Sequence, residues 1–176
     1  MYLTAKMELG KYCNKELEGK DEKIRDLFPE MFKSDNLDSV SVEFETGYWR
    51  KANHIHKWFV DNCQDGEDEC QISYVDREDL ETLKVVCQKV LKFENGEKKK
   101  VQIKTGWANG KDTFAEIEVI ADKEKIEELL PTTSGCFFGG EEYDEYYFGD
   151  LKETIEIIDK CLNLPEYWSF RYRSSW

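Results

Sequence analysis

The two histidines of the chain, His54 and His56, lie two residues apart in its densest run of aromatic and basic residues. Apolar residues recur at helical spacing through this run, which predicts one helix over residues 48–62. Side chains two positions apart on a helix point about 160° away from each other, so the two imidazoles are poorly placed to share a metal ion. The pattern places His56 partly in the core and His54 on the surface.

A small basic and aromatic patch on this helix is one candidate binding site. With about 100° of rotation per residue, several polar residues fall opposite the apolar face and one tryptophan falls on its flank. This patch, which could bind a phosphate or a nucleotide, consists of Arg50, His54, Lys57 and Trp58. The alternative is that its cations form exposed ion pairs with nearby acids, each worth about 0–1 kcal/mol.

A second candidate site is the segment 141–150, which interleaves five carboxylates with four aromatic residues. Carboxylates attract grooves rich in Lys and Arg, and aromatic rings add contact area and cation–π partners. The predicted partner-binding residues are Glu141, Glu142, Tyr143, Asp144, Glu145 and Tyr146. The alternative is a helix N-terminus, where acidic residues suit the helix dipole and Tyr147 or Phe148 packs inward.

Other motifs give weaker signals. The acidic loop 65–69 lacks the spacing of an EF-hand, and Thr132 to Gly135 lacks a phosphate-binding fingerprint. The sequence favours no nucleophile and base over any other pair. We therefore predict no catalytic residue, metal site or cofactor. Scattered cysteines without C-x-x-C spacing, an N-terminus without a signal-peptide core and the absence of a long apolar run predict a cytoplasmic protein.

The composition indicates one folded, acidic domain. The 176 residues carry a formal charge of −13 and are 40% hydrophobic, too apolar for a disordered acidic tail. Clustered Lys and Arg are needed to release counterions from a nucleic acid, so direct sequence-specific nucleic-acid binding is not expected. Basic partners suit such a chain, although the acidity alone could also serve solubility.

The order of the predicted elements indicates an α+β single domain over residues 1–176, with three or more helices on a small, mainly antiparallel sheet. Asp76 with Asp79 forms a capping-box pattern, Asp122 is placed to cap a short helix, and a long helix is expected over 142–162. Asn109-Gly110 predicts a β-hairpin within 98–121. Further strands are expected at 39–46, 72–75 and 167–172.

Three blocks of sequence resemble a family of small proteins encoded by phages, prophages and gut Firmicutes. They are Gly47–Asn53 with Ile55–Val60, Leu129–Thr132 with Ser134-Gly135 and Phe137–Gly139, and Tyr143–Glu145 with Tyr147-Phe148 and Asp150-Leu151. Relative to the family pattern, residues 98–121 are an insertion. The family supplies no catalytic residues that could be transferred to this chain.

The chain also resembles type II-A anti-CRISPR proteins, which inhibit Cas9 nucleases. The resemblance implies a phage or mobile-element protein that binds Cas9, or its guide-RNA complex, through an acidic surface in the bacterial cytoplasm. A phage accessory protein that binds a small ligand such as a nucleotide, or that is an enzyme, is the alternative.

Overall fold

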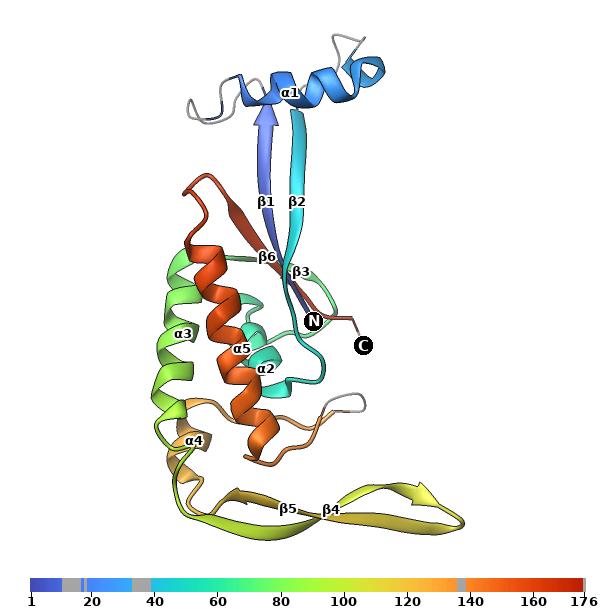
Figure 1. The fold of residues 1–176 in the computed structure, drawn as a ribbon, viewed down its shortest axis with the longest axis vertical. Coiled ribbons are helices and arrows are strands. Elements are labelled where there is room, and N and C mark those ends of the chain that lie inside the picture. The colour runs from blue at the N-terminus through green and yellow to red at the C-terminus, as the bar shows by residue number, and fades with distance from the viewer. Residues whose placement is uncertain (11–16, 18, 33–38, 136–138, 176) are drawn as a thin grey trace.

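Four strands from distant parts of the chain form the central sheet, in the order β2-β1-β6-β3 (Figure 1). The computed structural model describes residues 1–10, 17, 19–32, 39–135 and 139–175. The strands are β1 (Tyr2–Gly10), β2 (Ser39–Tyr48), β3 (Ile72–Val75) and β6 (Ser169–Arg173), and every neighbouring pair is antiparallel. The first and last strands of the chain are therefore hydrogen-bonded neighbours.

Alternation along the strands places one face of the sheet in the core. Leu3 and Ala5 of β1 are fully buried, and they pair with Tyr172 and Phe170 of β6, which are also buried. β1 pairs with β6 only as far as Lys6. Beyond that residue, β1 and β2 continue as a two-stranded ribbon with helix α1 (Lys20–Leu27) across its end, followed by the 3₁₀ turn η2 (Pro29–Phe32) (Figure 1).

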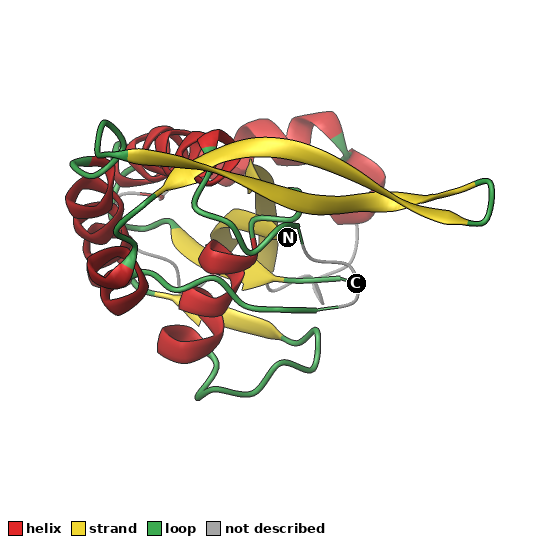
Figure 2. Cartoon of the chain, turned by 90° about the horizontal axis from the view of Figure 1, so that it is seen from below, coloured by secondary structure: helices red, strands yellow, loops and turns green. Residues whose placement is uncertain are grey.

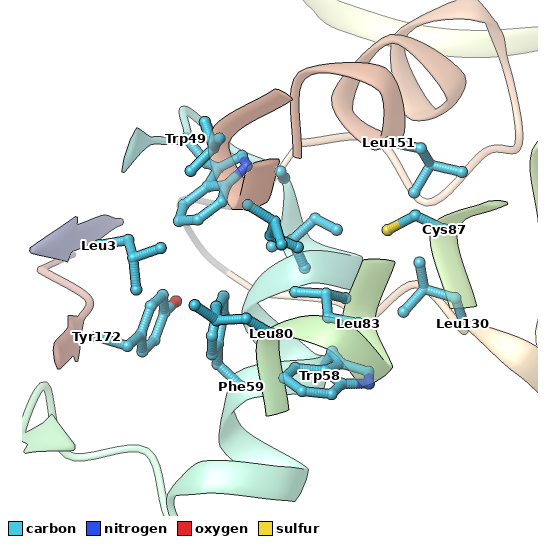
Figure 3. Close-up of a cluster of buried hydrophobic side chains, with 14 of the residues drawn as sticks. Leu3, Trp49, Trp58, Phe59, Leu80, Leu83, Cys87, Leu130, Leu151 and Tyr172 are labelled. Atoms are coloured by element: carbon cyan, nitrogen blue, oxygen red, sulfur yellow. The ribbon is translucent and has the colours of Figure 1, made fainter. Parts of the chain in front are cut away.

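Three helices pack against the sheet and against one another: α2 (Asn53–Cys63), α3 (Arg77–Leu91) and α5 (Glu145–Leu162). Figure 3 shows Leu3 and Tyr172 of the sheet close to Phe59 of α2. The rings of Phe59 and Tyr172 are stacked, with centroids 4.1 Å apart and planes inclined by 12°. One hydrophobic cluster joins residues of the sheet and helices, so the chain folds as the single α+β domain predicted from its sequence.

The hairpin of β4 (Lys98–Ala108) and β5 (Lys111–Ile120) forms a separate two-stranded sheet. Asn109 and Gly110 both have positive φ, 51° and 80°, as a two-residue hairpin turn between right-twisted strands requires. Figure 2 shows this hairpin passing across the molecule and projecting beyond its body. The hairpin predicted within 98–121 is present.

The start of α2 departs from the prediction. The helix expected over 48–62 begins only at Asn53, because Tyr48 remains in β2 and Lys51 has a φ of 67°, which interrupts any helix. The helix expected over 142–162 likewise begins at Glu145. The short helix α4 (Glu124–Leu129) has Lys123, not Asp122, at its N-cap.

Close backbone contact fixes β2 against α5. A Cβ atom placed on Gly47 would lie 2.5 Å from Cγ2 of Ile157, so the strand approaches the helix more closely than a larger residue allows. Two residues later, Trp49 is buried in the core (Figure 3). The position of α5 relative to the loop before α2 is therefore set by the core.

Candidate functional site

A pocket of about 340 Å³ opens where the start of α2, the first turns of α5 and the β4–β5 hairpin meet. Arg50 and Lys51 line it from the loop before α2, and Ile103 and Ile117 line it from the hairpin. The remaining wall comes from His54 of α2, Tyr146, Tyr147 and Asp150 of α5, and Gly139, Gly140, Glu142 and Asp144 of the preceding loop. The pocket thus joins residues of both candidate sites.

The prediction that His54 lies on the surface is wrong. His54 lies in the wall of this pocket. Its exposed fraction is 3%, and its ring packs on Tyr147 with centroids 4.2 Å apart. The wheel of α2 predicted an outer face with His54 on it, but Tyr147 of α5 covers His54, and seven of the eleven residues of α2 are buried. Among the described residues, His54 Nε2 has no hydrogen-bond partner, although it is fully buried.

The carboxyl group of Asp150 lies close to that nitrogen, with Oδ2 3.9 Å from His54 Nε2. The distance is too long for a hydrogen bond. Burial lowers the pKa of His54 to about 3, which keeps the imidazole neutral at pH 7. Burial, together with the nearby charges of Glu153 and Asp144, raises the pKa of Asp150 to about 7. A neutral imidazole therefore lies beside the Asp150 carboxyl group, which other carboxylates surround, without forming an ion pair with it.

Asn53 anchors the loop that forms one wall of the pocket. Its side chain donates to the carbonyl of Gly140 at 2.9 Å and accepts from the amide of Thr133 at 3.1 Å. Gly139 donates to the carbonyl of Lys51, and a Cβ on Gly139 would lie 2.8 Å from that oxygen. Asn53 is 1% exposed, so these contacts hold the loop from inside the protein.

The three blocks that carry the family resemblance converge at this pocket. The lining residues that belong to these blocks are Arg50 and Lys51 of the first, Gly139 of the second, and Asp144, Tyr147 and Asp150 of the third. Phe137 and Phe138 of the second block lie outside the described residues. The blocks therefore mark a three-dimensional site that no single stretch of sequence defines.

The acidic segment begins helix α5, as the alternative interpretation of these residues expected. Oδ1 of Asp144 accepts hydrogen bonds from the amides of Tyr146 and Tyr147, both at 3.0 Å. This contact satisfies two of the amides that every helix N-terminus leaves unpaired. Tyr143, predicted to contact a partner, is 2% exposed and packs edge-on against Tyr147, so its ring is part of the core.

Other members of that segment do reach the surface. Tyr146 is 74% exposed, Glu141 and Glu145 are exposed, and Glu142 and Asp144 are half-buried. Tyr146 and Asp144 also line a second hollow of about 270 Å³, to which Glu116 and Glu118 of β5 and Lys98 of β4 contribute. Glu116 also forms an exposed ion pair with Lys100 at 2.8 Å. We call this set the acidic-aromatic surface: Glu116, Glu118, Glu141, Glu142, Asp144, Glu145 and Tyr146. The two carboxylates of β5 could not be assigned to it from sequence, because only the fold brings the hairpin alongside α5.

The predicted basic patch does not form as a unit. Arg50 is exposed and lines the pocket with His54, but Lys57 forms an ion pair with Asp61 at 2.8 Å. Trp58 is 7% exposed and belongs to the core (Figure 3). Only the first two residues of the patch are therefore available to a ligand in the pocket.

The second histidine has a structural role. His56 Nδ1 lies 2.7 Å from the hydroxyl of Tyr172, and Nε2 lies 2.8 Å from Oδ2 of Asp68.

Burial raises the pKa of the Cys87 thiol to about 12, so this cysteine is a poor nucleophile at neutral pH. Within the described ranges, no group of three or more His, Cys, Asp or Glu side chains is arranged to hold a metal ion.

The fold and the site define an α+β domain with an acidic-aromatic surface beside a pocket of mixed charge. Comparison with protein-family models, with curated proteins and with solved structures gave no match. In the part of the chain that the structure describes, no helix is both long and apolar enough to cross a bilayer.

Proposed function

We propose that the protein binds a basic partner protein through its acidic-aromatic surface, and that it thereby inhibits a host-defence nucleoprotein on behalf of a phage or mobile element. The observation that supports this function is the 74% exposed ring of Tyr146, surrounded by carboxylates from α5, its preceding loop and β5. An exposed aromatic residue in an acidic setting offers contact area and cation–π geometry to Lys and Arg side chains.

The charges of this surface favour such a partner. Burial raises the pKa of Asp150, and the nearby charges of Glu153 and Asp144 raise it further, so negative groups repel one another here. A basic partner relieves that repulsion, speeds encounter and selects against acidic partners. The Asp144 cap and the buried Tyr147 and Phe148 already fix the first turn of α5. Binding therefore costs this turn little conformational entropy.

The family resemblance makes Cas9 the first partner to test. Cas9 holds its guide–target heteroduplex in a positively charged channel, which an acidic surface can occupy in competition with nucleic acid. Inhibition of this kind needs neither catalytic residues nor a cofactor. It places the action of the protein in the bacterial cytoplasm, where Cas9 works.

The test is direct binding to Cas9, with and without guide RNA, followed by target-cleavage assays. We expect a stable complex with one of the two forms and a loss of affinity of more than about tenfold for the double variant Glu141→Lys/Glu145→Lys. The control Glu22→Lys/Glu81→Lys makes the same charge change at exposed residues of α1 and α3. Absence of a complex with either form would reject Cas9 as the partner. An equal loss in the control would show that net charge matters and this surface does not.

The pocket supports a second candidate function, the binding of a small ligand such as a nucleotide. Arg50, Lys51 and His54 line the same pocket, and Nε2 of His54 has no hydrogen-bond partner among the described residues. A thermal-shift screen with nucleotides and divalent metals tests it, since a ligand at about 100 times its dissociation constant stabilises a protein by about 2.7 kcal/mol. A shift that Arg50→Ala abolishes would favour this function over partner binding.

A further inference from the structure

We propose that the pocket beside Tyr146 receives a single primary ammonium group, the end of a lysine side chain, between His54 Nε2 and the carboxylate of Asp150. This inference deepens the proposed function and rests on it in one respect, namely that the lysine belongs to the partner protein.

The spacing of the two acceptors fits one nitrogen between them. His54 Nε2 and Asp150 Oδ2 are 3.9 Å apart, too far for a hydrogen bond to each other. If a nitrogen lay about 2.8 Å from each of the two atoms, the angle between them at that nitrogen would be close to a right angle. Two N–H bonds of one ammonium group can point to both acceptors at such an angle. The planar fork of a guanidinium group suits the two oxygens of one carboxylate better than two acceptors from different residues.

The unpaired nitrogen of His54 is an independent indication of a missing donor. The His54 side chain is 3% exposed, and Nε2 has no hydrogen-bond partner among the described residues. Buried polar atoms are nearly always paired, so an unpaired one beside a pocket is unusual. With the proton on Nδ1, the neutral imidazole presents a lone pair at Nε2, which an ammonium N–H can use.

The rest of the pocket suits the stem of a lysine. Ile103 and Ile117 supply apolar wall for the methylene groups, and Tyr146 supplies an exposed aromatic ring near the charge. The carboxylates Asp144 and Glu142 line the same pocket. Arg50 and Lys51 also line it, and they repel a second cation. The pocket therefore suits a single lysine side chain of the basic partner.

The test uses the full chain and three small probes: Nα-acetyl-lysine methylamide, its Nε-acetylated form and the arginine counterpart. Imidazole ¹⁵N NMR follows His54, and His56 serves as an internal reference because Tyr172 and Asp68 contact its two nitrogens. We expect a saturable shift of the His54 Nε2 resonance with the lysine probe, binding at least tenfold weaker for the arginine probe, and no binding of the acetylated probe. Inorganic phosphate is the competing probe.

Asp150→Asn keeps the shape of the side chain and removes its charge, and it should weaken binding of the lysine probe at least tenfold. Glu156→Gln, an exposed position on the same helix, should leave binding unchanged. Equal binding of the acetylated probe would overturn the proposal. Phosphate binding that strengthens in Asp150→Asn would also overturn it, since the pocket would then be an anion site.

The two proposals fail in different ways. If the wild-type protein captures Cas9 or another basic partner but the lysine probe causes no shift of His54, the ammonium site is wrong and the partner surface stands. If the lysine probe binds but no basic protein is captured, the ammonium site stands and the partner-binding function is wrong.

Discussion

Nε1 of Trp49 donates a hydrogen bond to Oγ1 of Thr154 at 2.9 Å, and this contact links the residue after β2 to the middle of α5. Both side chains are buried, with exposed fractions of 1% and 0%. Thr154 in turn donates to the carbonyl of Asp150, one turn earlier on α5. Two consecutive hydrogen bonds thus connect Trp49 in the core to Asp150, which lines the pocket.

The first prediction concerns this link. Thr154→Val keeps the shape of the side chain but leaves the buried indole N–H without its acceptor, which should lower the free energy of unfolding by about 1–3 kcal/mol. Thr154→Ser retains the hydroxyl and should recover the part due to the hydrogen bond. Urea unfolding followed by tryptophan fluorescence measures both variants. If Thr154→Val is as stable as Thr154→Ser, the hydrogen bond contributes nothing.

The second prediction concerns the loop anchor. Asn53→Ala removes a buried side chain that bonds both Thr133 and Gly140, so we expect a loss of about 1–3 kcal/mol and faster amide exchange at Thr133. Asn53→Asp keeps the acceptor for the Thr133 amide and should preserve its protection. Unchanged exchange at Thr133 in Asn53→Ala would show that other contacts hold the loop.

The third prediction concerns pH. The pKa of Asp150 rises from 3.8 to about 7 on folding, so unfolding releases a proton in this range and Asp150 lowers stability as pH rises through it. The pKa of His54 falls from 6.5 to about 3, so unfolding takes up a proton and His54 raises stability as pH rises. Between about pH 4 and 6.5 the two effects oppose each other.

Asp150→Asn should therefore expose the contribution of His54. We expect the stability of this variant to rise more steeply than that of the wild type between about pH 4 and 6.5, and to exceed it above pH 7. Urea unfolding at pH 4.5, 6 and 8 measures the profiles, with Glu156→Gln as the control carboxylate on the same helix. Parallel profiles for Asp150→Asn and the wild type would mean that burial does not shift the Asp150 titration.

The fourth prediction concerns the hairpin. Val101 and Ile117 are direct partners in the β4–β5 ladder, so a two-residue Asn-Gly turn can replace residues 102–116. Val119 and Ile120, the buried base of the hairpin, remain. We expect the melting temperature to change by less than about 4 °C, which corresponds to about 1 kcal/mol for a domain of this size. A larger loss would place the projecting part of the hairpin among the elements that stabilise the core.

Local signals in the sequence predicted much of the fold. The turn at Asn109-Gly110 and the capping box of α3, where Asp79 accepts from the amide of Asp76 at 2.9 Å, depend on neighbouring residues alone. Strand alternation predicted β3 at its observed bounds and β2 and β6 within two residues of theirs. The turn and the capping box are set by interactions within a few residues of the chain. The strands pair with distant segments, and the sequence signalled only where each strand lies.

The candidate site was harder to predict because tertiary packing creates it. A helical wheel assumes one buried face, whereas α2 is buried on more than one side: the ring of Tyr147 packs on His54, and Trp58 belongs to the core. The same packing buries Tyr143, which the charge pattern had placed on the surface. Neither Glu118 nor Gly140 could be assigned to the site before the fold showed what lies beside α5.

The pairing of β1 with β6 has a consequence for how the protein reaches its native state. Tyr2 to Lys6 form their ladder with residues 169–173, so the central pair of strands closes a loop that spans nearly the whole chain. Contacts at such long sequence separation slow folding, because the entropy of closing the loop is lost before the ladder stabilises it. During synthesis, the burial of Leu3 and Ala5 is therefore complete only after residues 170–172 have been made and have paired with β1. Until then this edge of β1 is unpaired and open to mispairing.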